Sequence, residues 1–177
     1  GDFAPGSVVE DVTITVFFTK VGALFDPGTC PGPGLWSDAA DEIRFRLMSP
    51  DGTSVTLVDY NDYVSSNPAV GAVTVTFDDA ASASVAGQPI TSGTFQPNGS
   101  LADFDGLDPV GNGGVWTLEL ADDAFNDPLC FGGAILNLAV SGPADLSVAK
   151  SDGADPVYAG ETLSYQVTVD NIGVDAA

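Results

Sequence analysis

The chain has 177 residues, with 25 acidic and 4 basic side chains, no histidine and a formal net charge of −21. Such a charge repels nucleic-acid phosphates and anionic lipids, so we expect neither nucleic-acid binding nor membrane insertion, and the missing histidine excludes imidazole catalysis and ligation. Hydrophobic residues make up 44% of the chain, enough for a folded core, while 21 glycines and 12 prolines disfavour long helices.

Short segments of alternating apolar and polar residues follow one another from residue 8 to residue 141, and a period of two is typical of half-buried strands. In the first of them Val12, Val16 and Phe18 share one face. The sequence S-P-D-G-T at 49–53 predicts a tight turn, because proline presets φ and Asp-Gly favours chain reversal. In chain order the predicted strands are residues 8–19, 42–48, 53–58, 70–77, 114–121 and 134–141, with long loops at 21–40 and 80–113. Together they predict an all-β fold, an antiparallel sandwich.

A domain boundary is expected near Gly142 and Pro143, which divides the chain into residues 1–142 and 143–177. The tail contains two predicted strands, residues 146–150 and 162–171, and alternation gives them an apolar face. Two strands that expose such a face are not stable alone in water, so we expect another surface to cover them. The residues expected to make this partner contact are Leu146, Val148, Leu163, Tyr165, Val167 and Val169.

Two cysteines, Cys30 and Cys130, lie 100 residues apart in loops rich in glycine and proline. They are either buried free thiols or a disulfide, and we favour the disulfide because cysteines in such loops gain little from burial. A disulfide in turn predicts a secreted, extracellular protein. The sequence has no apolar run of about 18 residues, the length that a membrane span needs. Its start at Gly1 fits either a removed signal peptide or a trimmed chain.

Five motifs occur in a fixed order in the first 142 residues. They are D-E-I-R-F-R-L-M-S-P-D-G-T-S-V-T-L at 41–57, T-F-D-D-A-A at 76–81, G-T-F-Q-P-N-G-S-L-A-D-F-D-G at 93–106, N-G-G-V-W-T-L-E-L-A-D at 112–122 and A-I-L-N-L-A-V-S-G at 134–142. Through them residues 1–142 resemble the P domain, or homo B domain, that follows the catalytic domain of proprotein convertases and many bacterial subtilisin-like proteases. The resemblance implies a jelly-roll-like β-sandwich. The chain departs from the family pattern at Thr19-Lys20, where a histidine-threonine is usual, and in an insertion at residues 21–40.

The tail carries a second set of motifs, A-D-L-S-V-A-K at 144–150, D-P-V-x-x-G at 155–160 and L-S-Y-Q-V-T-V-D-N at 163–171. It resembles the opening of an immunoglobulin-like repeat that occurs many times over in large bacterial and archaeal cell-surface proteins. The match covers only the first strands of such a domain. The resemblance therefore implies an incomplete immunoglobulin-like domain in residues 143–177.

Aspartates cluster in loops and at strand ends, where the simplest interpretation is that they form turns and keep an acidic surface soluble. Ca²⁺ takes about six to eight oxygen ligands, mostly carboxylates and backbone carbonyls on flexible loops. The P-domain resemblance implies calcium at matching aspartates, although no cluster has the EF-hand spacing. The candidate calcium ligands are Asp78, Asp79, Asp103, Asp105, Asp122 and Asp127.

Catalytic motifs are missing: the sequence has no pairing of a nucleophile with a base and no phosphate-binding loop, so we predict that the protein is not an enzyme. Loop aromatics, Tyr60, Tyr63 and Trp36, offer a surface for stacking on a carbohydrate, and packing onto the core is the simpler interpretation. The sequence Asn98-Gly99-Ser100 fits the pattern of an N-glycosylation acceptor.

The apolar tail leaves three interpretations open. It packs on its own sandwich, continues into the rest of a longer protein, or adds to the sheet of a neighbouring subunit. We favour a non-catalytic structural subunit or segment of a cell-surface filament that assembles head-to-tail by β-strand donation, so that its partners are copies of itself or neighbouring domains of a larger surface protein. The alternative is a calcium-binding accessory module of a secreted hydrolase, which binds carbohydrate or stabilises a protease.

Overall fold

The computed structural model describes residues 3–20, 30, 40–64, 72–123, 128–142, 146–152 and 165–171. The chain divides into two compact units, Val8–Val140 and a second unit of Gly1–Ser7 with Ser141–Ala177. Regular structure in the described residues consists of strands and three short 3₁₀ helices, η1 (Ala40–Glu42), η2 (Leu101–Phe104) and η3 (Gly111–Gly113). Among the described residues, no helix is long and apolar enough to span a bilayer.

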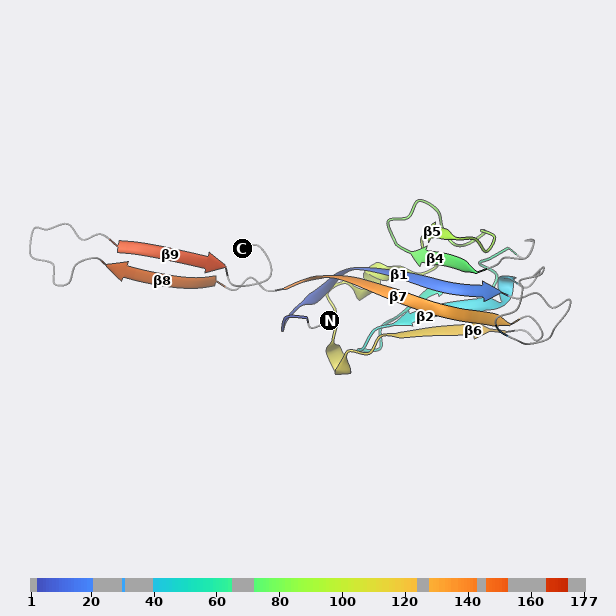
Figure 1. Ribbon diagram of the computed structural model, residues 1–177, viewed down its shortest axis with the longest axis horizontal. Helices are drawn as coiled ribbons and strands as arrows, with labels where there is room; N and C mark the ends of the chain where they lie inside the picture. Colours follow the sequence, from blue (N-terminus) through green and yellow to red (C-terminus); the bar gives the residue numbers. More distant parts are fainter. Residues whose placement is uncertain are drawn as a thin grey trace, which may run out of the picture. The chain divides into compact units, whose positions relative to one another are not determined.

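The first layer of the larger unit is a four-stranded sheet in the order β5-β4-β1-β7. Figure 1 shows β1 and β7 running side by side along its length. β1 is antiparallel to β4, with Val16 opposite Val75, whereas β4 and β5 are parallel. The strands of this sheet are β1 (Val8–Lys20), β4 (Val73–Phe77), β5 (Gly93–Phe95) and β7 (Leu129–Ser141).

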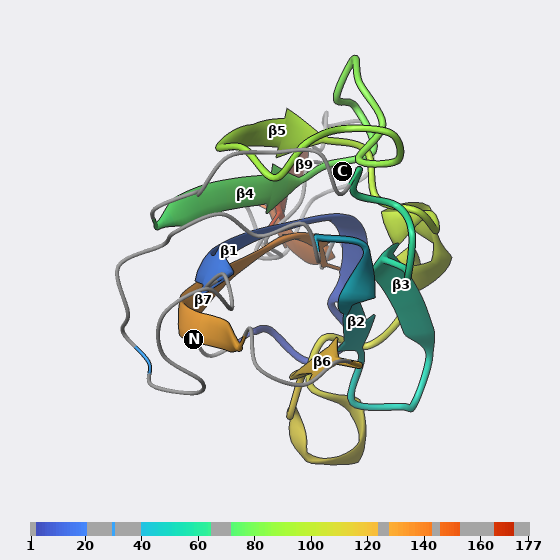
Figure 2. The ribbon, with the colours of Figure 1, turned by 90° about the vertical axis from the view of Figure 1, so that its right-hand side faces the viewer.

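The second layer is a three-stranded antiparallel sheet in the order β3-β2-β6, made of β2 (Ile43–Met48), β3 (Ser54–Val58) and β6 (Thr117–Asp122). The predicted turn at 49–53 joins β2 to β3. The Asp51 carboxylate stabilises it by accepting hydrogen bonds from Ser49 Oγ and from the Thr53 N–H. Gly52 in this turn has φ +97°, a left-handed conformation that glycine adopts without strain. Figure 2 shows the two sheets from their end, with β4 and β5 far from β6.

Alternate residues of both sheets point inward and form one hydrophobic core. On β1 the inward side chains Val12, Ile14, Val16 and Phe18 are all buried, as their alternation predicts. Phe18 meets Phe45 of β2 edge to face, with ring centroids 5.0 Å apart, and so joins the two layers. The predicted all-β sandwich is confirmed.

The predicted long loop at 80–113 contains more structure than expected. It holds β5, η2 and η3, and buries Leu101 and Phe104 of η2. A three-residue strand is too short to show an alternation in sequence, which explains why β5 was not predicted. β7 also begins earlier than the predicted strand, at Leu129. The loop predicted at 21–40 lies mostly outside the described residues.

The predicted disulfide is confirmed: Cys30 and Cys130 are bonded, with their Cα atoms 5.5 Å apart. Cys130 is the second residue of β7, so the bond fastens residue 30 to the beginning of that strand. A disulfide that closes a loop of 100 residues stabilises the fold by about 4–5 kcal/mol in the chain-entropy model.

The second unit contains a two-stranded antiparallel sheet of β8 (Leu146–Asp152) and β9 (Tyr165–Asn171). Its register pairs Val148 with Val169 and Lys150 with Val167. Directly opposed residues share a face, so the three valines lie on one face, whereas Ser147 and the other residues of odd number in β8 lie on the opposite face. The three valines are exposed, at 66, 58 and 58%.

Candidate functional site

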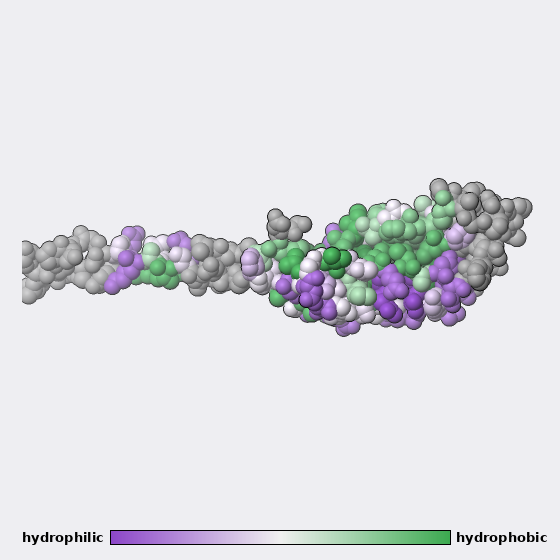
Figure 3. All heavy atoms as spheres, turned by 90° about the horizontal axis from the view of Figure 1, so that it is seen from below, coloured by the Kyte–Doolittle hydropathy of each residue, from purple (hydrophilic) through white to green (hydrophobic). Residues whose placement is uncertain are grey.

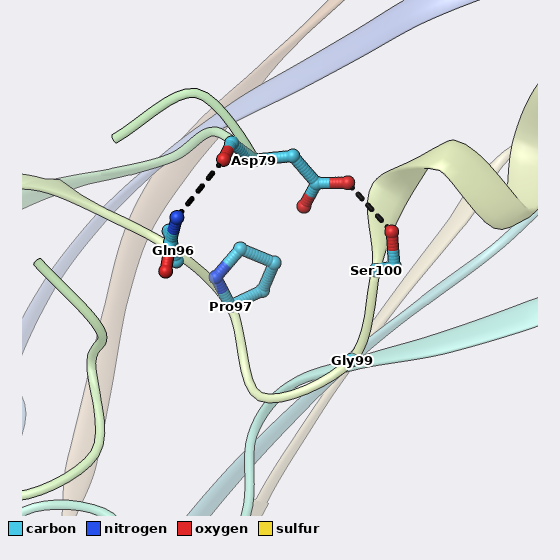
Figure 4. Close-up of a pocket in the computed structure, with 5 residues that line it drawn as sticks. All are labelled: Asp79, Gln96, Pro97, Gly99 and Ser100. Atoms are coloured by element: carbon cyan, nitrogen blue, oxygen red, sulfur yellow. Dashed lines mark hydrogen bonds between the residues drawn. The ribbon is translucent and has the colours of Figure 1, made fainter. Parts of the chain in front are cut away.

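The sandwich has a polar cavity of about 270 Å³, lined by Asp79, Gln96, Pro97, Gly99 and Ser100. Figure 4 shows that Asp79 faces both neighbouring polar side chains. The Gln96 side-chain amide donates to the Asp79 main-chain oxygen at 3.2 Å, and the Ser100 hydroxyl donates to the Asp79 carboxylate at 2.7 Å. These contacts hold together the segment after β4 and the segment after β5.

The Asp79 carboxylate lies at the beginning of η2. Besides the Ser100 hydroxyl, it accepts the backbone N–H groups of Leu101 at 3.1 Å and Ala102 at 3.0 Å. The first N–H groups of a helix lack partners within the helix, and a carboxylate is a favoured acceptor for them. Asp79, predicted as a calcium ligand, therefore acts as the cap of η2.

The other predicted calcium ligands are not gathered around Asp79. The Asp78 carboxylate accepts the Ala80 N–H at 2.7 Å in a local turn, and Asp103 and Asp105 are exposed. Among the described residues, no three histidine, cysteine or acidic side chains lie close enough to hold a metal ion together. Asp127 lies outside the described residues. Calcium binding stays a prediction.

Asp122, also a predicted calcium ligand, faces a cation. Its two carboxylate oxygens accept hydrogen bonds from Lys20 Nζ, each at 2.9 Å, and Oδ2 also accepts the Leu129 N–H at 2.8 Å. Glu42 Oε2 lies 3.6 Å from the same Nζ. This cluster joins β1, η1 and β6 with the first residue of β7.

This ionic cluster was not predicted from the sequence, yet the sequence contained a signal. Lys20 continues the even-numbered positions of β1 whose apolar side chains point inward, so the alternation places its ammonium group on the core face. A lysine at the end of a buried stripe requires an internal partner, because an isolated charge away from water is costly. Neither Glu42 nor Asp122 could be picked as that partner from 25 acidic residues.

The two described loop aromatics, Tyr60 and Tyr63, make contacts within the sandwich. Tyr63 is buried, and its hydroxyl has no hydrogen-bond partner among the described residues. Burial raises the pKa of Tyr63 above its ordinary value, and the neighbouring Asp62 charge adds to this shift. The Tyr60 ring lies under the Arg44 guanidinium, whose central carbon is 5.2 Å from the ring centroid. Trp36 lies outside the described residues.

Some apolar side chains of the sandwich are only partly covered by its core. β6 and β7 are the end strands of their sheets, and the bond from the Leu129 N–H to Asp122 places the start of β7 beside the end of β6. Figure 3 shows a continuous hydrophobic area on the sandwich when it is seen from below. On these two strands the half-buried side chains that pack against the core include Leu118, Leu120, Leu136 and Leu138.

Partner contacts predicted in the tail fall on β8 and β9, apart from Leu163, which lies outside the described residues. The exposed face described above contains Val148, Val167 and Val169. The paired strands also include Leu146, opposite Asn171, and Tyr165, opposite Asp152.

No family model, no curated protein and no solved structure matches this chain. The resemblances to a P domain and to an immunoglobulin-like repeat therefore rest on the quoted motifs.

Proposed function

We propose that this chain is a non-catalytic structural segment of a cell-surface protein, which assembles head-to-tail when its β8–β9 sheet adds to the sandwich of a second copy. The observation that carries the proposal is the exposed apolar face of that sheet, with Val148, Val167 and Val169. A two-stranded sheet is marginally stable in water, so covering this face is the step that stabilises it. The disulfide supports an extracellular location.

A second copy offers a matching acceptor. β6 and β7 end their sheets, and the end strand of a sheet presents unpaired N–H and C=O groups to an incoming strand. Beside them lie the half-buried leucines Leu118, Leu120, Leu136 and Leu138, and Ile135 of β7 is 52% exposed. The donated valines and the accepting leucines belong to different surfaces of the same chain, so the contact between two copies is heterologous. A heterologous contact of this kind propagates into a filament.

Charge sets the conditions under which copies associate. The formal charge of −21 makes two copies repel each other, and the described cations on the sandwich surface, Arg44 and Arg46, each lie 3.9 Å from Glu119. Salt at physiological strength screens charges beyond about 8 Å, so it weakens the repulsion without weakening apolar contact. We expect assembly to increase with ionic strength.

Electron microscopy and light scattering of the purified chain test the proposal. We expect filaments at high salt, and single particles after deletion of residues 144–177. A sharper pair of variants is Val167→Asp and Thr168→Asp, which place the same charge on opposite faces of β9. Only Val167→Asp should abolish the filaments. Equal assembly of the deletion variant and the full chain refutes strand donation.

A second function, binding of a small polar ligand by an accessory module, is favoured by the cavity at Asp79. Its donors and acceptors, Asp79, Gln96 and Ser100, suit a hydroxyl-rich molecule such as a carbohydrate. A glycan-array screen separates the two functions: saturable binding that Gln96→Ala weakens supports the accessory module, and the structural proposal expects none.

A further inference from the structure

Lys20, the last residue of β1, has a fully buried side chain. Its Nζ lies 2.9 Å from both oxygens of the Asp122 carboxyl group and 3.6 Å from Glu42 Oε2. A nitrogen that is equidistant from two carboxyl oxygens lies opposite the carboxyl carbon. The structure therefore holds a lysine nitrogen against Asp122 Cγ, with a second carboxyl group within reach of the same nitrogen.

The reacting nitrogen of this cluster is shielded from water, although the Glu42 side chain as a whole is 29% exposed. The Lys20 side chain is 0% exposed, that of Asp122 is 18% exposed, and the Glu42 Oε2 atom is itself buried. As an ion pair the arrangement adds little stability, because the removal of two charges from water costs about as much as their attraction returns. For a reaction that joins an amine to an acid and releases water, however, a shielded nitrogen held in a fixed position is favourable.

We propose that Lys20 and Asp122 condense into an intramolecular amide, an isopeptide bond, with Glu42 as the acid–base catalyst. The Lys20 ammonium first gives a proton to Glu42, and the free amine then forms the Nζ–Cγ bond. The Cγ–Oδ1 bond breaks, and its oxygen leaves as water with the two protons that Nζ has lost, which Glu42 relays. An ammonium and a carboxylate give one amide and one water, so the reaction requires no oxidant, reductant or cofactor.

Leu129 has a defined part in this reaction. Its backbone N–H donates to Asp122 Oδ2 at 2.8 Å, the distance at which a preorganised donor stabilises negative charge on a carbonyl oxygen. The donor assigns Oδ2 as the oxygen that carries charge in the tetrahedral intermediate and stays in the amide. Oδ1, which Lys20 also contacts, is then the oxygen that leaves.

The amide links the two layers of the sandwich. Lys20 belongs to the four-stranded sheet and Asp122 to the three-stranded sheet, and they are 102 residues apart in sequence. The disulfide at Cys130 lies close to the proposed amide, because both are at the beginning of β7. Reductant breaks the disulfide and leaves an amide intact. This inference goes beyond the proposed assembly and does not depend on it.

Mass spectrometry of the reduced, denatured full chain tests the bond. We expect a mass lower by one water than the sequence requires. Trypsin then localises the missing water, because the chain has only 4 cleavable residues, Lys20, Arg44, Arg46 and Lys150. With the amide in place, residues 1–44 stay joined to residues 47–150 after reduction. A folded chain with the full sequence mass and separate peptides overturns the proposal.

Two variants separate the amide from a simple ion pair. Glu42→Gln keeps Lys20 and Asp122 but removes the proton relay, so we expect a folded protein that gains one water in mass and releases residues 1–20 with trypsin. Lys20→Arg keeps the positive charge and cannot form the same amide. Circular dichroism confirms that each variant is folded before its mass is compared. A Glu42→Gln variant that still forms the amide completely refutes the role of Glu42.

Discussion

The side-chain amide of Asn98 donates to both carboxylate oxygens of Asp62, each at 3.1 Å. Asp62 is only 8% exposed and also accepts the Asp59 N–H at 2.6 Å, so donors from its own turn and from the distant Asn98 hold its charge inside the fold. The asparagine that fits a glycosylation pattern is thus already engaged in a structural contact.

Replacement of Asn98 by alanine should therefore destabilise the fold. The substitution leaves a nearly buried carboxylate without two of its hydrogen bonds, and the loss of hydrogen bonds to a charged group costs about 2 kcal/mol. Urea unfolding measures the change. Asn137→Ala is the matched control, because Asn137 is exposed and makes one long bond of 3.4 Å to Thr13. Similar losses in the two variants contradict the importance of the Asp62 contact.

Asp79→Ala tests the cap of η2. Removal of a carboxylate that satisfies the first N–H groups of a helix costs about 1 kcal/mol, and here the Ser100 hydroxyl loses its acceptor as well. Asp103→Ala, at an exposed position within η2, should change the free energy of unfolding by less than about 0.5 kcal/mol.

Calcium binding is tested by thermal unfolding in Ca²⁺ and in a chelator. A ligand that binds only the folded state raises Tm with its concentration, so the prediction from the P-domain resemblance is a higher Tm in Ca²⁺. Magnesium at the same concentration controls for general screening of the acidic surface. Identical melting curves in Ca²⁺ and chelator reject a calcium site.

Because of Tyr63, we expect the free energy of unfolding to decrease at alkaline pH. Burial and the Asp62 charge raise its pKa in the folded state above the ordinary value of 10.0. The unfolded chain therefore loses this proton first, so the contribution of Tyr63 is fully present below pH 10 and declines as pH rises above it. Tyr63→Phe should flatten this decline, and near neutral pH it should cost little, since the hydroxyl has no partner among the described residues. An unchanged alkaline slope in Tyr63→Phe contradicts the assignment.

The disulfide and the proposed amide should be coupled. With the amide present, Cys30–Cys130 closes a loop of only about 20 residues, so reduction should cost about 3 kcal/mol. In Glu42→Gln, where the amide is absent, the disulfide closes the full loop of 100 residues and reduction should cost about 4–5 kcal/mol. Urea unfolding with and without reductant measures both values. Equal costs in the two proteins argue against coupling.

The sequence was sufficient to predict those parts of the fold that follow from alternation. β1 and β2 repeat their apolar positions over enough residues to be recognised, and the Asp51-Gly52 turn has a specific backbone requirement. β5 could not be found, because three residues do not establish a period. A parallel pairing such as β4 with β5 depends on the whole path of the chain between them.

The candidate sites were harder to predict than the strands. Asp79 and Asp122 look alike in sequence, but one caps a helix and the other faces a lysine across the sandwich. The difference depends on which strands become neighbours, and local patterns do not specify it. Tyr63 likewise lies in a loop segment with no alternation that would predict its burial.

The four-stranded sheet has unequal borders. β5, at one border, is three residues long, whereas β7, at the other, is 13 residues long. Few backbone groups are available along β5, so an added strand can form a long series of backbone hydrogen bonds with this sheet only along β7. Growth by strand addition to this sheet would therefore be polar, with two filament ends that elongate at different rates.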